Sequence, residues 1–167
     1  MHSTQTTKIF DVSADRLWQA FDDFGGIHKF HPLVESSPTL GSATRGLGCE
    51  RVCNLYGGGS LKERVIGYEP GKRMSVEIYD AGPFPLKYAV ADIGIEPAGL
   101  NRSTAVFAMR FEPKFGMLGW LMAKLVMRRQ FKSMLDKLLA GLETYLATGR
   151  HIGRNGVPLN EPVPALR

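Results

Sequence analysis

The amino-acid sequence predicts an α+β domain in which a curved antiparallel sheet of seven strands wraps around one long C-terminal helix. Residues 34–112 alternate between apolar and polar side chains and are divided by short turns that contain glycine or proline, a pattern typical of antiparallel hairpins. Residues 116–147 return to helical spacing. The chain has 167 residues and is 44% hydrophobic, which is enough for one domain with its own core.

The first elements are a strand and two short helices. Residues 4–12, TQTTKIFDV, are rich in strand-forming side chains. Ser13 suits a helix N-cap, and apolar residues recur at helical spacing as far as Phe24, so we expect a helix over 13–24. Gly25-Gly26 should end it, and IHKFHP can form one further helical turn that Pro32 stops.

Six more strands follow. They are expected near 34–40, 48–55, 60–69, 73–80, 86–96 and 103–112. In the segment 73–80, Met74, Val76 and Ile78 share one face and polar side chains take most of the other, so one face of the sheet should be buried. A bent sheet around one helix leaves few residues to fill the middle, and we expect a hollow there.

The last helix should carry a long apolar stripe. Its members are Leu121, Leu125, Phe131, Met134, Leu135, Leu138, Leu142 and Tyr145. Gly149 is a plausible stop. We therefore expect one domain over residues 1–148 and a proline-containing tail over 149–167 that lies on the surface or is disordered.

Composition and charge exclude several kinds of site. The net charge of +5 is mild and spread along the chain, and no nucleic-acid-binding motif is present, so no nucleic-acid partner is predicted. Cys49 and Cys53 would lie roughly 13 Å apart on a strand, too far for a disulfide. They do not form a metal motif either, and we predict neither metal nor cofactor. Reduced thiols and an N-terminus without an apolar signal core indicate a cytoplasmic protein.

Three long segments, together with the closing helix, resemble the START-like (SRPBCC) superfamily. They are VSADRLWQAFDDFGGIHKFHP, GLGCERVCNLYGGGSLKERV and EPGKRMSVEIYDAGPFPLKYAV. Within the superfamily they look most like the polyketide cyclase/dehydrase and lipid-transport group. This resemblance implies a helix-grip fold, with an apolar cavity between the sheet and the C-terminal helix. It does not specify activity, because the same fold serves aromatase/cyclases, lipid carriers and hormone receptors.

The segment GLGCERVCNLYGGGSLKER places a charged residue on each strand of a predicted hairpin. Arg51 and Glu63 can form either a buried polar pair at one end of the cavity or a salt bridge on the solvent face. Their apolar neighbours two positions away favour the inward orientation. A segment-by-segment match to the abscisic acid receptors of the superfamily implies the same, and it also puts His31 and Tyr88 at pocket positions.

The remaining candidates form the cavity wall. Cys53 lacks a base that would make it a nucleophile, so we interpret it as a small buried residue. Tyr88 can either donate a hydrogen bond to a ligand or form part of the wall. The expected ligand-binding residues are His31, Arg51, Cys53, Glu63, Val76, Tyr88, Phe107, Met109, Met127, Phe131 and Met134.

Two main hypotheses for the function share this cavity. The first is a binding protein for a hydrophobic or aromatic small molecule that is lipid-, polyketide- or quinone-like. The alternative is an enzyme of the aromatase/cyclase type, which would use the same groups as acids and bases in cyclisation and dehydration. The amphipathic segment around Trp120, with basic residues beside it, could also contact a membrane surface, a protein partner or a second copy in a homodimer.

Overall fold

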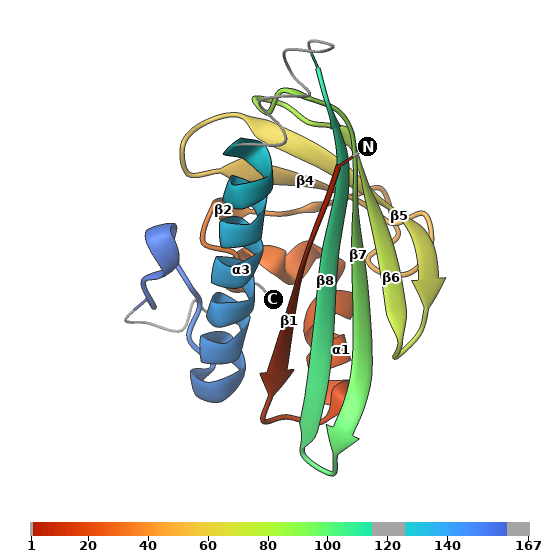
Figure 1. Cartoon of the computed structure of the whole chain (residues 1–167), viewed down its shortest axis with the longest axis vertical. Coiled ribbons are helices and arrows are strands. Elements are labelled where there is room, and N and C mark those ends of the chain that lie inside the picture. The colour runs from red at the N-terminus through yellow and green to blue at the C-terminus, as the bar shows by residue number, and fades with distance from the viewer. Residues whose placement is uncertain (1, 115–125, 160–167) are drawn as a thin grey trace.

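The structure is a computed structural model that describes residues 2–114 and 126–159, and it shows an antiparallel sheet curved around a long helix (Figure 1). The element order is β1 (His2–Phe10), α1 (Ala14–Asp22), η1 (Phe24–Lys29), β2 (Val34–Ser36), β3 (Thr39–Leu40), β4 (Glu50–Leu55), β5 (Ser60–Glu69), β6 (Arg73–Asp80), β7 (Leu86–Gly99), β8 (Arg102–Pro113), α3 (Arg128–Thr148) and η3 (Arg154–Gly156). The predicted α+β architecture is confirmed.

The sheet follows the order β1-β8-β7-β6-β5-β4-β2, and β3 also pairs with β4. The first strand, β1, forms one edge of the sheet and pairs with the last strand, β8. His2 lies opposite Phe111 and Phe10 opposite Ser103. Within the described residues the sheet has eight strands, where the sequence predicts seven. The expected strand 34–40 divides into β2 and β3 around Ser37 and Pro38, because proline has no N–H to donate to a ladder.

Two short helices follow β1, as predicted. Ser13 caps α1 by accepting a hydrogen bond from the N–H of Arg16, and Leu17, Trp18 and Phe21 are buried. The next turn is a 3₁₀ helix, η1, which contacts β2 and β4. Together α1 and η1 bring their aromatic side chains to the inner side of the sheet, where Phe21 lies near Phe107 of β8.

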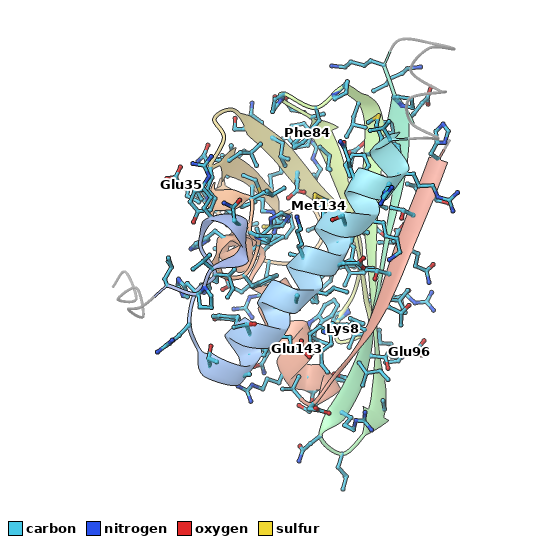
Figure 2. The ribbon with its side chains drawn as sticks, turned by 60° about the vertical axis from the view of Figure 1, so that its left-hand side comes forward. Lys8, Glu35, Phe84, Glu96, Met134 and Glu143 are labelled. Carbon is cyan, nitrogen blue, oxygen red and sulfur yellow. The ribbon has the colours of Figure 1, made fainter. Side chains whose placement is uncertain are left out.

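Helix α3 lies across β1 on the concave side of the sheet. Polar contacts fix it there. The Nζ of Lys8 lies 2.9 Å from Oε2 of Glu143 (Figure 2), and Thr6 donates to Asp136. The helix ends at Gly149, whose φ of 70° favours glycine. The first part of the predicted helix 116–147, including Trp120, lies outside the described residues.

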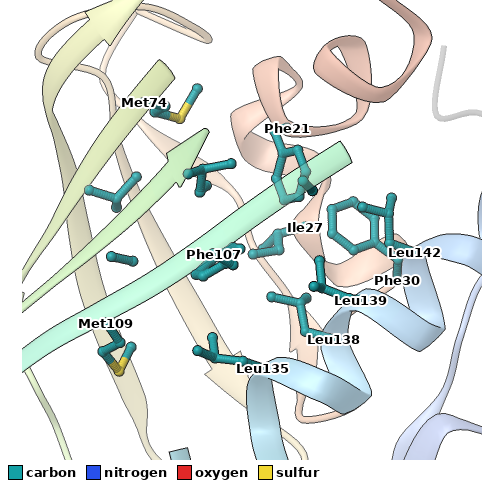
Figure 3. Packing of buried hydrophobic residues seen from close by; sticks show 14 of the residues in the cluster. Phe21, Ile27, Phe30, Met74, Phe107, Met109, Leu135, Leu138, Leu139 and Leu142 are labelled. Atoms are coloured by element: carbon teal, nitrogen blue, oxygen red, sulfur yellow. The ribbon is translucent and has the colours of Figure 1, made fainter. Parts of the chain in front are cut away.

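The core fills the space between α3, the two short helices and the inner face of the sheet. Figure 3 shows Phe21, Ile27 and Phe30 facing the leucines of α3. A Cβ added at Gly141 would lie 2.3 Å from the carbonyl oxygen of Phe30, so α3 meets the end of η1 backbone to backbone. None of the helices in the described ranges is long and apolar enough to cross a membrane.

Residues 150–159 differ from the expected tail. The Ile152 side chain is 1% exposed and belongs to the core. Its N–H donates to the Lys29 carbonyl (2.8 Å), and the N–H of Asn155 donates to the Pro32 carbonyl (3.3 Å). This segment therefore packs over η1 and the residues that follow it.

Candidate functional site

A cavity lies between the inner face of the sheet, α3 and the short helices. Residues from α1, η1, β4 to β8 and α3 line it, and most are apolar. The space open to the centre of a water molecule is about 80 Å³. Phe84 and Met134 (Figure 2) are partly exposed lining residues, one from the β6–β7 connection and one from α3. The site is therefore a mostly apolar hollow suited to a small organic ligand.

A buried ion pair forms part of the wall. Arg51 of β4 lies directly opposite Glu63 of β5 in the ladder. The Arg51 Nε lies 2.5 Å from Oε2 of Glu63, and the two side chains are 6% and 11% exposed. The inward orientation is therefore observed, rather than a salt bridge on the solvent face. A buried charged pair is costly unless its hydrogen bonds are completed.

Phe24 provides the further contacts that Arg51 needs. Its carbonyl oxygen accepts a hydrogen bond from Arg51 Nη1 at 2.6 Å, and the guanidinium carbon lies 4.0 Å from the centre of its ring. The Arg51 guanidinium thus meets a carboxylate, a carbonyl and an aromatic face. No sequence pattern indicates the carbonyl contact, because it depends on where η1 crosses the sheet.

Cys53 lies two positions along β4, on the same face as Arg51. Its Sγ is 3.4 Å from Oε2 of Glu63. Burial and the neighbouring Glu63 carboxylate raise the pKa of the Cys53 thiol far above its ordinary value. The thiol stays protonated and donates to Glu63, so Cys53 is not an activated nucleophile.

His31 follows η1 and is buried at the same cavity. Burial, together with the Arg51 charge, lowers the pKa of His31 to about 3, so the ring is neutral at physiological pH. The N–H of Leu33 donates to Nδ1 at 3.1 Å. Because Nδ1 is an acceptor, the ring proton is on Nε2. His31 therefore carries one N–H donor that a ligand could use.

The apolar predictions divide into two groups. Val76, Phe107, Met109, Phe131 and Met134 line the cavity together with His31, Arg51, Cys53 and Glu63. Met127 is buried in the core but is not a lining residue in the described part of the chain. Sequence reasoning did not assign several other lining residues to the cavity, among them Phe30, Met74, Phe84, Leu86 and Ala91.

Tyr88 needs a correction. It is half-buried on β7 opposite Glu112 and does not line the cavity that the described residues form. Ala89, Ala91 and Ile93 face the core, so Tyr88 takes the opposite face of the strand. An irregular pairing between Leu86 and Tyr88 turns Leu86 inward in its place. A one-residue shift of this kind is not visible in the sequence pattern.

A second hollow lies between α1 and the end of α3. It has more open space, about 260 Å³, but its walls are more polar and more open to solvent. Its charged groups are already engaged, since Arg16 donates to the Leu146 carbonyl and Lys29 pairs with Asp23. In the described residues no cluster of three or more His, Cys, Asp or Glu side chains is placed to hold a metal ion. The internal cavity is therefore the candidate site.

A comparison with models of known protein families shows which family the chain belongs to. The family model described as polyketide cyclase / dehydrase and lipid transport matches residues 1–147. The chain belongs to this polyketide cyclase/dehydrase and lipid transport family. The predicted resemblance to the polyketide cyclase/dehydrase and lipid-transport group is thereby confirmed. No curated protein sequence matches the chain.

Solved structures share the fold of this family member at low sequence identity. A START superfamily protein from Mycobacterium smegmatis has a TM-score of 0.73 and 14% identity, covering 88% of this chain and 98% of its own. The Zhui aromatase/cyclase from Streptomyces sp. R1128 has a TM-score of 0.66 and 13% identity, covering 89% and 97%. Norcoclaurine synthase from Thalictrum flavum has a TM-score of 0.63 and 16% identity, covering 85% and 94%. At these identities the similarity concerns the fold alone.

Proposed function

We propose that this protein binds a hydrophobic or aromatic small molecule in the cavity between the sheet and α3. The observation that carries the proposal is the combination of an apolar wall with a few convergent polar groups at one place. Phe107, Met109 and Leu135 are among the apolar lining, while Arg51, Glu63 and His31 supply the polar contacts. Ligand sites in proteins usually have this composition.

Three methionines in the cavity wall support a ligand that varies in shape. Met74 and Met109 line the cavity from the sheet, and Met134 lines it from α3. The unbranched thioether side chain adapts its shape at little cost. The free space of about 80 Å³ would then increase when these side chains move around a larger lipid-, polyketide- or quinone-like molecule.

An aromatase/cyclase activity is the alternative, and one observation favours it. A neutral His31 with its proton on Nε2 could donate a hydrogen bond to a ketone of a reactive chain. Cys53, however, is held as a protonated thiol. The two functions differ in outcome, because a carrier releases its ligand unchanged and an enzyme does not. Mass analysis of the ligand before and after incubation therefore separates them.

The binding proposal can be tested in two steps. Native mass spectrometry of freshly purified protein should show a stoichiometric adduct, and the denatured extract then gives its chemical class. In parallel, toluene should be titrated into labelled protein while backbone amide resonances are followed. The amides of Ala91, Phe107 and Leu135 should shift. The proposal fails if no ligand co-purifies and saturating toluene leaves these amides unchanged.

A further inference from the structure

The polar groups of the cavity are balanced in charge. Arg51 carries a positive charge that Glu63 neutralises at 2.5 Å. Cys53 is a thiol donating to the same carboxylate oxygen, and His31 is neutral. The remaining carboxylate in the described lining is Asp23, which already pairs with Lys29 at 2.6 Å. The cavity therefore offers a ligand no uncompensated positive charge within the described residues.

This balance of charge determines which kind of chemical group on a ligand can be buried beside Arg51. A carboxylate or phosphate would lose its hydration and find the guanidinium charge already neutralised by Glu63, with Nε bonded to Glu63 and Nη1 to the Phe24 carbonyl. It would also lie close to the Glu63 carboxylate, which repels it. A neutral acceptor avoids both costs and can accept the Nε2–H of His31, whose Nδ1 is taken by the N–H of Leu33.

We propose that Glu63 is a specificity-determining residue, which makes the cavity select apolar molecules ending in a neutral hydrogen-bond acceptor, such as a ketone or quinone carbonyl, over carboxylates of the same shape. This inference rests on the proposed binding function. It assigns His31 as the donor to the ligand and Arg51–Glu63 as an ion pair whose charges already balance each other.

Three probes of nearly identical shape test the selection. Acetophenone, benzoate and α-methylstyrene each carry a short branched group on a phenyl ring, and they have the same number of non-hydrogen atoms. They differ in that the branch is a ketone, a carboxylate or a hydrocarbon. Dissociation constants at neutral pH come from amide chemical shifts. Acetophenone should bind most tightly and benzoate about tenfold or more weaker.

A charge-removing variant should reverse this preference. In Glu63→Gln, Arg51 loses its counter-charge while the side-chain shape is kept, so benzoate should gain about tenfold or more and overtake acetophenone. Glu50→Gln is the matched control, because it removes the same charge from β4 on the exposed side, where Glu50 pairs with Arg64. That variant should rank the three probes as the wild-type protein does.

The outcomes separate this inference from the binding function. If the wild-type protein binds benzoate as tightly as acetophenone, the selection is wrong although the cavity binds ligands. If none of the probes binds, the binding function itself fails. Should Glu63→Gln not fold, His31→Leu provides the second test. It should abolish the advantage of acetophenone over α-methylstyrene, and an undiminished advantage would overturn the role of His31.

Discussion

Arg51 depends on partners that are far apart in the sequence. Glu63 reaches it across the β4–β5 ladder, and Phe24 approaches from the 3₁₀ helix η1. The pair is 2.5 Å apart and buried, so its members are separated from water by the fold itself. Such a pair contributes little net stability compared with apolar side chains, but either half alone is strongly destabilising.

Removing one charge of the buried Arg51–Glu63 pair should therefore reduce stability more than removing an exposed charge. We expect Arg51→Met to lower the free energy of unfolding by roughly 3–5 kcal/mol, because Glu63 stays buried without a counter-charge. Urea denaturation measures the change. Arg64→Met, which breaks the exposed pair with Glu50, is the control and should have a much smaller effect. Equal losses in the two variants would show that Arg51 is not held in a dry environment.

The buried His31 ring should make stability depend on pH. Its pKa of about 3 in the folded protein lies below the ordinary 6.5, so the folded state binds fewer protons than the unfolded state. Stability from this group is complete above pH 6.5 and is lost as the pH falls toward 3. The loss is on the order of 1.4 kcal/mol per pH unit. Burial also lowers the pKa of His28 and His151, which act in the same direction.

The His31 contribution can be isolated by substitution. Between pH 6.5 and about pH 5, where most carboxylates stay ionised, wild-type protein should lose stability more steeply than His31→Leu. Denaturant melts at several pH values measure both slopes. A slope unchanged by the substitution would mean that His31 is protonated as readily in the folded protein as in the unfolded chain.

Residue patterns predicted some side chains of the cavity wall correctly and others wrongly. Arg51 and Glu63 could be placed inward because each has apolar neighbours two positions away on its strand. Tyr88 could not be placed correctly, since an irregular pairing at Leu86 changes which side chain faces the core. The protonated nitrogen of His31 depends on one local hydrogen bond from Leu33, which no periodicity reveals.

Among the elements, the segment 150–159 has an unexpected role. Its backbone bonds to Lys29 and Pro32, on either side of His31, and Ile152 packs near Gly141 of α3. The segment thus holds the chain that carries His31 against α3. Its sequence predicts no such packing, because a single buried isoleucine produces no periodic pattern and the prolines indicate irregular structure.

One pair of substitutions within this segment tests its contribution. Ile152→Ala should destabilise the protein by about 2–4 kcal/mol, because it leaves a cavity in the core. Val157→Ala in the same segment should stay within about 0.5 kcal/mol of wild type, since Val157 is 61% exposed. Thermal or urea unfolding compares the two. If the losses are similar, residues 150–159 do not contribute to the core in solution.

Most other elements could be predicted because their signals are local. Ser13 caps α1 through its side chain, and Gly149 ends α3 in the left-handed backbone conformation that glycine favours. The strand expected over 34–40 divides where Pro38 interrupts the ladder, and there the side-chain hydroxyl of Ser37 donates to the Gly25 carbonyl. This division depends on η1 lying beside it, which is a tertiary contact.

At the scale of the whole molecule, the cavity exists because α3 rests on β1 while the sheet curves away from it. Small side chains such as Ala91 on β7 keep the space open. The fold class and the presence of a hollow could be predicted from the order of elements and from the family resemblance. The ligand could not, because side-chain shape and charge inside the hollow vary freely on a common scaffold.

Filling the hollow should remove binding while leaving the fold intact. Ala91→Leu adds volume to a wall that borders free space, so we expect toluene binding to be lost with little change in stability. Ala108→Leu is the control, because Ala108 lies on the outer face of β8 opposite Asp92. The amide titration with toluene measures both variants. Wild-type affinity in Ala91→Leu would place the bound molecule elsewhere.

The pairing of β1 with β8 also determines when the sheet can be completed during synthesis of the chain. During synthesis, β1 emerges before the other strands of the sheet, yet its partners at residues 103–111 are made only after each of those strands has begun. Contacts between such distant segments form slowly. Until then β1 is an unpaired strand, which invites association with other chains. Its polar stretch TQTTK should keep it hydrated during that wait, and the sheet is completed only when the first strand to be made finds the last.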